Sequence, residues 1–128
     1  MQSRDKTQKK ESGILLSLTA LPSEYGIGSF GEEAFRFIDF LKQSNQSYWQ
    51  LLPLCPVGKG NSPYSSVCGF AGEILLIDIQ RLIDCGLLKA EEIPQCDFSN
   101  RINYSKVRLF KLPLLKKAAE NFDIENKK

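Results

Sequence analysis

Two short apolar runs separated by an amphipathic stretch dominate the first half of the chain. Residues 13–18 and 48–52 are mostly apolar and are bounded by Gly or Pro, a pattern typical of strands buried on both faces. Between them, apolar side chains recur at helical spacing: Phe30, Ala34, Phe37, Ile38 and Leu41. Ser29 followed by Glu32 predicts a capping box at the start of this helix. Strand, helix and strand within residues 13–52 predict a βαβ unit with parallel strands and a right-handed crossover.

The second half of the chain alternates a short apolar run with helical patterns. Residues 74–79 predict a third buried strand or extended segment, followed by a short helix that closes at Gly86. Asp78 then caps this helix, or serves as a carboxylate at the end of a barrel strand; we favour the cap. A last amphipathic helix is predicted over residues 104–122, kinked or split by Pro113. Residues 1–11 are polar and predict a disordered lead-in, which leaves residues 12–128 as one segment.

A loop over residues 54–66 follows the second predicted strand. It contains two Gly and two Pro, so it cannot be regular structure. Its far end carries Asn61 and Ser62, with Pro63 stiffening the chain before Tyr64. An aromatic face beside hydroxyl groups suits a sugar ring, whose C–H face packs on the aromatic while its hydroxyls form hydrogen bonds. On the loop alone, a plain surface loop with a half-buried Tyr is the favoured alternative.

The amino-acid composition excludes several kinds of catalytic site, metal site and binding partner. The chain of 128 residues has no His, which excludes Ser-His-Asp and Cys-His nucleophilic sites and mixed Cys/His zinc sites. Its four cysteines form no C-x-x-C pair, so we expect no metal and instead reduced, mostly buried thiols in a cytoplasmic protein. A net charge of +2 without a clustered basic face predicts no nucleic-acid partner. No apolar stretch is long enough to span a membrane.

The glycines before the first predicted helix match a known cofactor-binding motif. Residues 26–31 match G-x-G-x-x-G, the dinucleotide fingerprint. However, the first Gly does not follow a strand directly, and residues 44–60 lack the acidic residue that should hold the ribose. We therefore interpret these residues as loop glycines before a helix, and predict no cofactor.

Several segments together resemble one family. They are residues 12–16 (SGILL), 21–28 (LPSEYGIG), 37–41 (FIDFL), 46–54 (QSYWQLLPL), 61–66 (NSPYSS) and 70–72 (FAG). Their order and spacing resemble the start of the 4-alpha-glucanotransferases, also called amylomaltases or disproportionating enzymes. The resemblance extends over residues 12–122.

The resemblance implies a fold and an activity. It predicts the N-terminal part of a (β/α)8 TIM barrel of the amylomaltase type, incomplete in this chain because family members are about four times longer. Such enzymes of starch and glycogen metabolism transfer alpha-1,4-glucan segments between maltooligosaccharides by a retaining double displacement, without a cofactor. Carried over by motif, Ser62 and Tyr64 line the donor sugar site, and Asn61 belongs to the same substrate-binding loop. The resemblance therefore favours the sugar-binding interpretation of the loop over the plain surface loop.

Four places depart from the family pattern, one of them Ser17-Leu18, where His-Pro or Pro-Val is usual in many members. Lys59 replaces a usual Tyr, Asn61 replaces a usual Asp, and Glu73 precedes Ile74 where Asn-Pro is common. The resemblance also places the catalytic carboxylates beyond this stretch, so we assign no catalytic residue here. We predict that the isolated chain is inactive without the carboxyl-terminal part of the barrel. Two alternatives stay open: a non-catalytic remnant that binds glucan weakly at most, and a small α/β interaction module unrelated to sugars.

Overall fold

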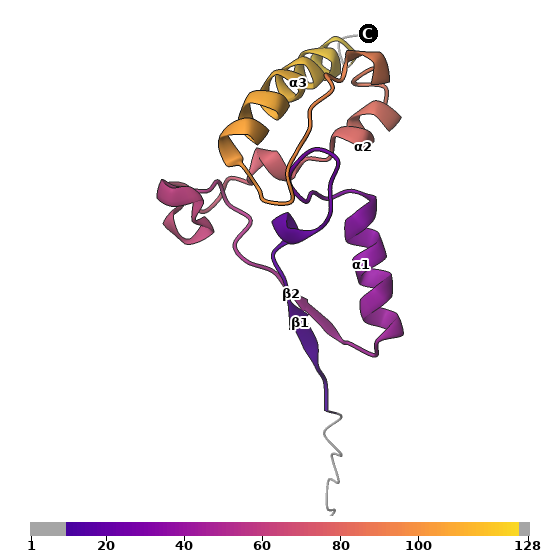
Figure 1. The fold of residues 1–128 in the computed structure, drawn as a ribbon, viewed down its shortest axis with the longest axis vertical. Helices are drawn as coiled ribbons and strands as arrows, with labels where there is room; N and C mark the ends of the chain where they lie inside the picture. Colours follow the sequence, from indigo (N-terminus) through magenta and orange to yellow (C-terminus); the bar gives the residue numbers. More distant parts are fainter. Residues whose placement is uncertain (1–9, 126–128) are drawn as a thin grey trace, which may run out of the picture.

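The computed structural model describes residues 10–125 (Figure 1). Two strands, β1 (Gly13–Leu15) and β2 (Tyr48–Gln50), flank helix α1 (Glu32–Gln43) in sequence. Helices α2 (Ile79–Asp84) and α3 (Tyr104–Glu125) follow, and five short 3-10 helices connect the elements: η1 (Leu18–Ala20), η2 (Lys59–Asn61), η3 (Pro63–Ser65), η4 (Ile74–Leu76) and η5 (Ala90–Glu92). The predicted lead-in over residues 1–11 lies outside the described residues except for its last two.

The predicted βαβ unit is confirmed, with shorter strands than expected. β1 and β2 pair in parallel, with Ile14 opposite Trp49, and α1 lies alongside them (Figure 1). The prediction of burial on both faces is wrong, since Leu15 is 59% exposed and Tyr48 is 57% exposed. The sheet of the described residues has two strands only, so each strand has one open edge.

The capping box predicted for α1 is also wrong. The N-cap of α1 is Gly31, which has no side chain to accept a hydrogen bond. Ser29 is buried instead, and its hydroxyl donates to Asp78 Oδ2 at 2.6 Å. The side chain of Ser29 therefore forms a long-range hydrogen bond instead of the local helix cap that the sequence pattern predicts.

Residues 74–79 do not form a third strand. They form η4 and lead into Ile79, the first residue of α2, because two acidic side chains cap these helices. Glu73 accepts from the Leu75 N–H, and Asp78 accepts from the Arg81 N–H at 3.0 Å. The preference for Asp78 as a helix cap is thus confirmed.

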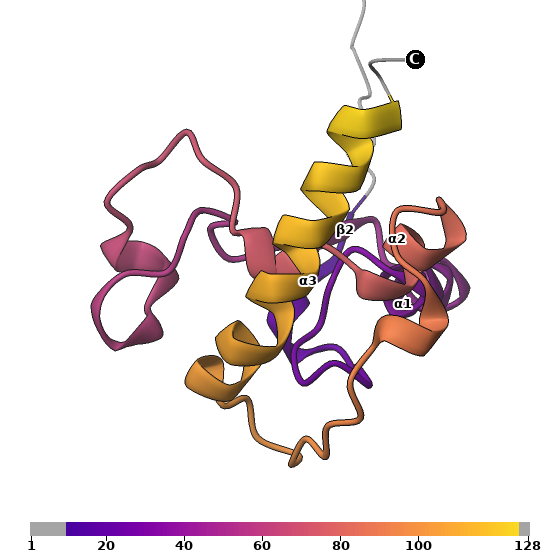
Figure 2. The ribbon, with the colours of Figure 1, turned by 90° about the horizontal axis from the view of Figure 1, so that it is seen from above.

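Helix α3 lies across the top of the molecule above α2 (Figures 1 and 2). We predicted that Pro113 kinks or splits this helix. The helix continues through Pro113, so it is not split. Phe110, Leu114 and Ala118 are buried against Ile79 and Leu88, and this packing outweighs the backbone donor that Pro113 lacks. Among residues 10–125, no helix has the length and apolarity needed to cross a membrane.

The four cysteines are free thiols, but they are not mostly buried. Cys68 and Cys85 are exposed, while Cys55 and Cys96 are half-buried. Cys68 lies in the segment after the loop and Cys85 at the end of α2, both on the surface. The expectation of burial is therefore corrected.

Candidate functional site

The loop over residues 54–66 projects from one side of the molecule, away from α1 and α2 (Figure 2). It folds back on itself through hydrogen bonds from the Gly58 N–H to the Ser62 carbonyl and from the Asn61 N–H to the Gly58 carbonyl, both 3.0 Å. The Ser65 carbonyl occupies the space that a side chain on residue 58 would need. Gly60 adopts φ +71° within the turn. The sequence thus builds a closed turn and not a flexible linker.

Ser62 and Tyr64 stand together at the tip of this turn. Ser62 caps η3, with its hydroxyl oxygen accepting from the Tyr64 N–H at 3.2 Å. That bond leaves the Ser62 O–H proton available to a ligand. The Tyr64 ring is 73% exposed, so the aromatic face is open. The half-buried Tyr of the alternative interpretation does not match this exposure.

Asn61 is held by a residue that the sequence did not indicate. The Arg108 guanidinium of α3 donates to Asn61 Oδ1 at 3.0 Å and lies over the Tyr104 ring. Asn61 itself adopts φ 58°, a conformation that Asn tolerates well. Forty-seven residues separate the two partners, so no local pattern could have paired them.

Glu73 forms the second unforeseen contact with the loop. Its carboxylate accepts from the Val57 N–H at 2.9 Å and from the Leu75 N–H at 3.1 Å. Its own N–H donates to the Leu54 carbonyl at 2.8 Å. The residue that departs from the family pattern therefore ties the start of the loop to η4.

Lys111 secures η4 from the other side. The side chain is fully buried, and Nζ donates to the carbonyls of Leu75 at 2.5 Å and Ile77 at 2.6 Å. Burial lowers the pKa of Lys111 from 10.5 to about 8, against the opposing effect of Asp78 and Glu73. A neutral amine retains two N–H donors, so both carbonyls stay satisfied in either protonation state.

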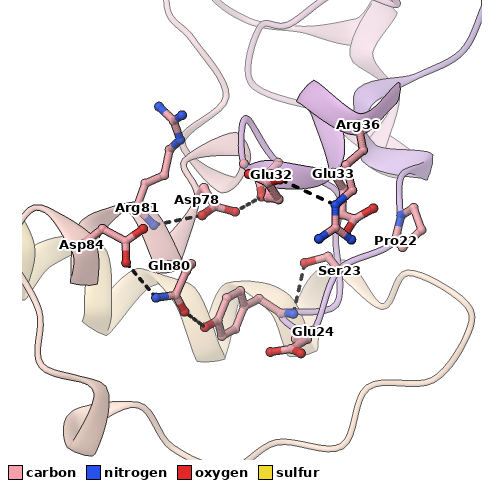
Figure 3. Close-up of a pocket in the computed structure, with 13 residues that line it drawn as sticks. Pro22, Ser23, Glu24, Glu32, Glu33, Arg36, Asp78, Gln80, Arg81 and Asp84 are labelled. Atoms are coloured by element: carbon pink, nitrogen blue, oxygen red, sulfur yellow. Dashed lines mark hydrogen bonds and ion pairs between the residues drawn. The ribbon is translucent and has the colours of Figure 1, made fainter. Parts of the chain in front are cut away.

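Two hollows flank these elements. A small one of about 140 Å³ lies beneath the loop, lined mainly by apolar side chains including Leu54, Pro63 and Tyr104. This volume is well below that of an ordinary ligand pocket. The larger one, about 690 Å³, lies between α1 and α2 (Figure 3).

Several charged side chains that line the larger hollow already have partners. Arg36 forms ion pairs with Glu32 and Glu33, and Gln80 donates to Asp84 (Figure 3). Tyr25 contributes one aromatic ring to this lining, and burial raises the pKa of its hydroxyl. Within residues 10–125, no group of three metal-ligating side chains is close enough to hold an ion.

The glycines of the G-x-G-x-x-G match lie at packing contacts. A side chain on residue 28 would meet the backbone of Leu18 and Leu21, and one on residue 31 would meet the Asp78 carboxylate. These close approaches account for the glycines without a phosphate.

The comparisons with known proteins agree on one family. A family model described as 4-alpha-glucanotransferase matches residues 16–128. The chain is 42% identical over 118 residues to a 4-alpha-glucanotransferase of Streptococcus pneumoniae, covering 90% of this chain and 23% of that protein. It is 46% identical over 121 residues to the chloroplastic/amyloplastic 4-alpha-glucanotransferase of Solanum tuberosum, covering 91% and 21%.

A solved structure is similar over the same stretch. The amylomaltase from Streptococcus agalactiae in complex with acarbose superposes with a TM-score of 0.81 at 37% identity, covering 89% of this chain and 24% of that one. The chain therefore has the fold of the N-terminal part of an amylomaltase barrel. It spans about a quarter of the length of the relatives that it matches.

Proposed function

Since the chain belongs to the 4-alpha-glucanotransferase family, we propose that it supplies the glucan-binding loop of an enzyme that transfers alpha-1,4-glucan segments between maltooligosaccharides. The observation that carries this proposal is the loop tip. Ser62 and Tyr64 are fixed by η3, and the aromatic face and one hydroxyl proton stay open to a sugar. Asn61 adds an amide at the same tip.

The chemistry requires groups from elsewhere in the barrel. A retaining double displacement needs two carboxyl groups about 5–5.5 Å apart, one as nucleophile and one as acid/base. Three acidic side chains of this segment have other structural positions. Asp78 caps α2, Glu73 accepts from two backbone amides, and Asp39 is exposed on α1. The role of this segment is therefore to bind and orient the donor sugar.

The exposed apolar surface supports docking of the remaining barrel on this segment. Leu15 and Tyr48 on the strands are more than half exposed, and Phe35, Ile38 and Phe40 on α1 are about half exposed. Exposed apolar side chains beside an open strand edge favour pairing with further strands and helices. The partners of the proposed enzyme are thus alpha-glucan and the carboxyl-terminal part of the barrel. Four free thiols favour a cytoplasmic enzyme.

A chimera tests the proposal. This chain replaces the matching segment of the Streptococcus pneumoniae relative, and glucose release from maltotriose is measured. We expect transfer activity in the chimera and a loss of at least about tenfold with Tyr64→Ala, because the sugar loses its stacking surface. Tyr64→Phe is the matched control, which keeps the ring and should retain most of the rate. An unchanged rate in Tyr64→Ala would remove Tyr64 from the site.

The interpretation as a remnant is favoured by Lys59 and Asn61, where the family commonly has an aromatic and an acidic residue. It predicts a folded chimera without activity. Restoring Tyr at position 59 and Asp at position 61 would then recover transfer, whereas the proposed enzyme shows transfer without these changes. Family membership leaves no support for a module unrelated to this enzyme class.

A further inference from the structure

We propose that Glu73 is a positioning residue for the loop over residues 54–66, holding Ser62 and Tyr64 in their binding arrangement. This inference rests on the proposed function of that loop in glucan binding. It also changes the meaning of position 73, which the sequence presented as a loss of the family pattern.

Glu73 contacts the loop at two points of its first limb. Its carboxylate accepts from the Val57 N–H, and its own N–H donates to the Leu54 carbonyl. Pro56 has no N–H, so the limb before Gly58 has one backbone donor fewer. A hydrogen bond to a charged carboxylate is stronger than one to a neutral acceptor, and Glu73 is half-buried, which limits competition from water.

Few other hydrogen bonds join the loop to the rest of the protein. In the described part of the chain, three hydrogen bonds join residues 54–66 to segments beyond residue 68, and two of them are made by Glu73. The third is the exposed Arg108–Asn61 bond. Asn61 and Tyr64 at the loop tip are exposed, so burial contributes little to their position.

Glu73 can fix the loop because its own position is fixed. It caps η4, where Leu75 is buried against Ile27 and Val107. Lys111 of α3 holds the carbonyls of Leu75 and Ile77. A continuous path of contacts therefore runs from α3 through η4 and Glu73 to Val57 at the base of the loop.

The test measures loop order and glucan affinity separately, on the full 128-residue chain. Amide hydrogen exchange is followed for Val57 and Gly58 in the loop and for Leu88 and Val107, whose N–H groups bond to carbonyls outside both the loop and η4. Affinity is measured by titration with maltoheptaose. The variants are Glu73→Ala, Glu73→Gln, which keeps one acceptor oxygen, and Glu91→Gln, an exposed control.

We expect Glu73→Ala to speed loop exchange by about tenfold or more, the effect of a lost hydrogen bond to a charged group. Glu73→Gln should fall between Glu73→Ala and the wild type, and Glu91→Gln should match the wild type. Leu88 and Val107 should be unchanged. The apparent Kd for maltoheptaose should rise by the same factor by which the ordered loop is depleted.

Two results would overturn the inference. Unchanged exchange at Val57 and Gly58 would show that Glu73 does not hold the loop. Equal acceleration at all four amides in both Glu73 variants would assign Glu73 to the fold as a whole. If the wild type binds no maltoheptaose while the loop still loosens selectively, the proposed function fails and the positioning role stands.

Discussion

The buried Lys111 makes the stability of the chain depend on pH in an unusual direction. Its pKa is about 8 in the folded protein and 10.5 as the ordinary value for an exposed lysine. Between these values the unfolded chain binds more protons than the folded one, so stability rises with pH. Charging this amine in the folded state costs about 3 kcal/mol, and that cost disappears as the pH approaches 10.5.

The perturbation that isolates this effect is Lys111→Met, which keeps much of the length of the side chain and removes the titrating group. Urea unfolding is followed by the fluorescence of Trp49, the one Trp of the chain, whose indole N–H donates to the Leu16 carbonyl. The wild-type free energy of unfolding minus that of the variant is compared at about pH 7 and about pH 10. We expect this difference to increase by about 2–3 kcal/mol.

The variant also leaves the Leu75 and Ile77 carbonyls without their donor, which costs about 1–3 kcal/mol each at every pH. That loss adds a constant to the difference in free energy of unfolding between the wild type and the variant. It does not alter how this difference changes with pH. Lys116→Met, on the exposed side of the same helix, controls for the removal of a charge. A difference for Lys111→Met that stays constant over this pH range would show that burial does not lower the pKa of Lys111 in the folded protein.

Three further predictions concern stability and activity. Asp78→Ala removes the cap of α2 and the acceptor of Ser29, so we expect a loss of about 2–3 kcal/mol in urea unfolding; a loss no larger than that of the exposed Asp39→Ala would contradict this. Pro113→Ala restores a backbone donor inside α3 and should stabilise the chain by about 1–3 kcal/mol, with a lower unfolding midpoint as the opposing result. The isolated chain should release no glucose from maltotriose, and turnover that survives repurification would disprove this.

The elements that the sequence predicts correctly are those with a local physical cause. The helix over residues 32–43 follows from periodic apolar side chains, and the parallel strands follow from a short crossover through that helix. Asp78 caps α2 because its carboxylate reaches an N–H three residues away. Such causes can be recognised from a few neighbouring residues in the sequence.

The features that the sequence does not predict depend on distant partners. The local pattern assigns Ser29 to a helix cap, but its hydroxyl bonds to Asp78, 49 residues away. Glu73 and Arg108 reach the loop from η4 and α3. Apolar strands predicted to be buried are exposed because burial depends on what lies beside them and not on their own composition. For the loop, motif resemblance indicates Ser62 and Tyr64, whereas the residues that hold them required the structure.

Binding of alpha-1,4-glucan at the loop tip can be measured by titrating the isotope-labelled chain with maltoheptaose and following its amide resonances. We expect saturable amide shifts at Asn61, Ser62 and Tyr64, which are abolished in Tyr64→Ala and retained in Tyr48→Ala. Shifts confined to the hollow between α1 and α2, or no shift at the loop at millimolar sugar, would contradict binding at the loop tip.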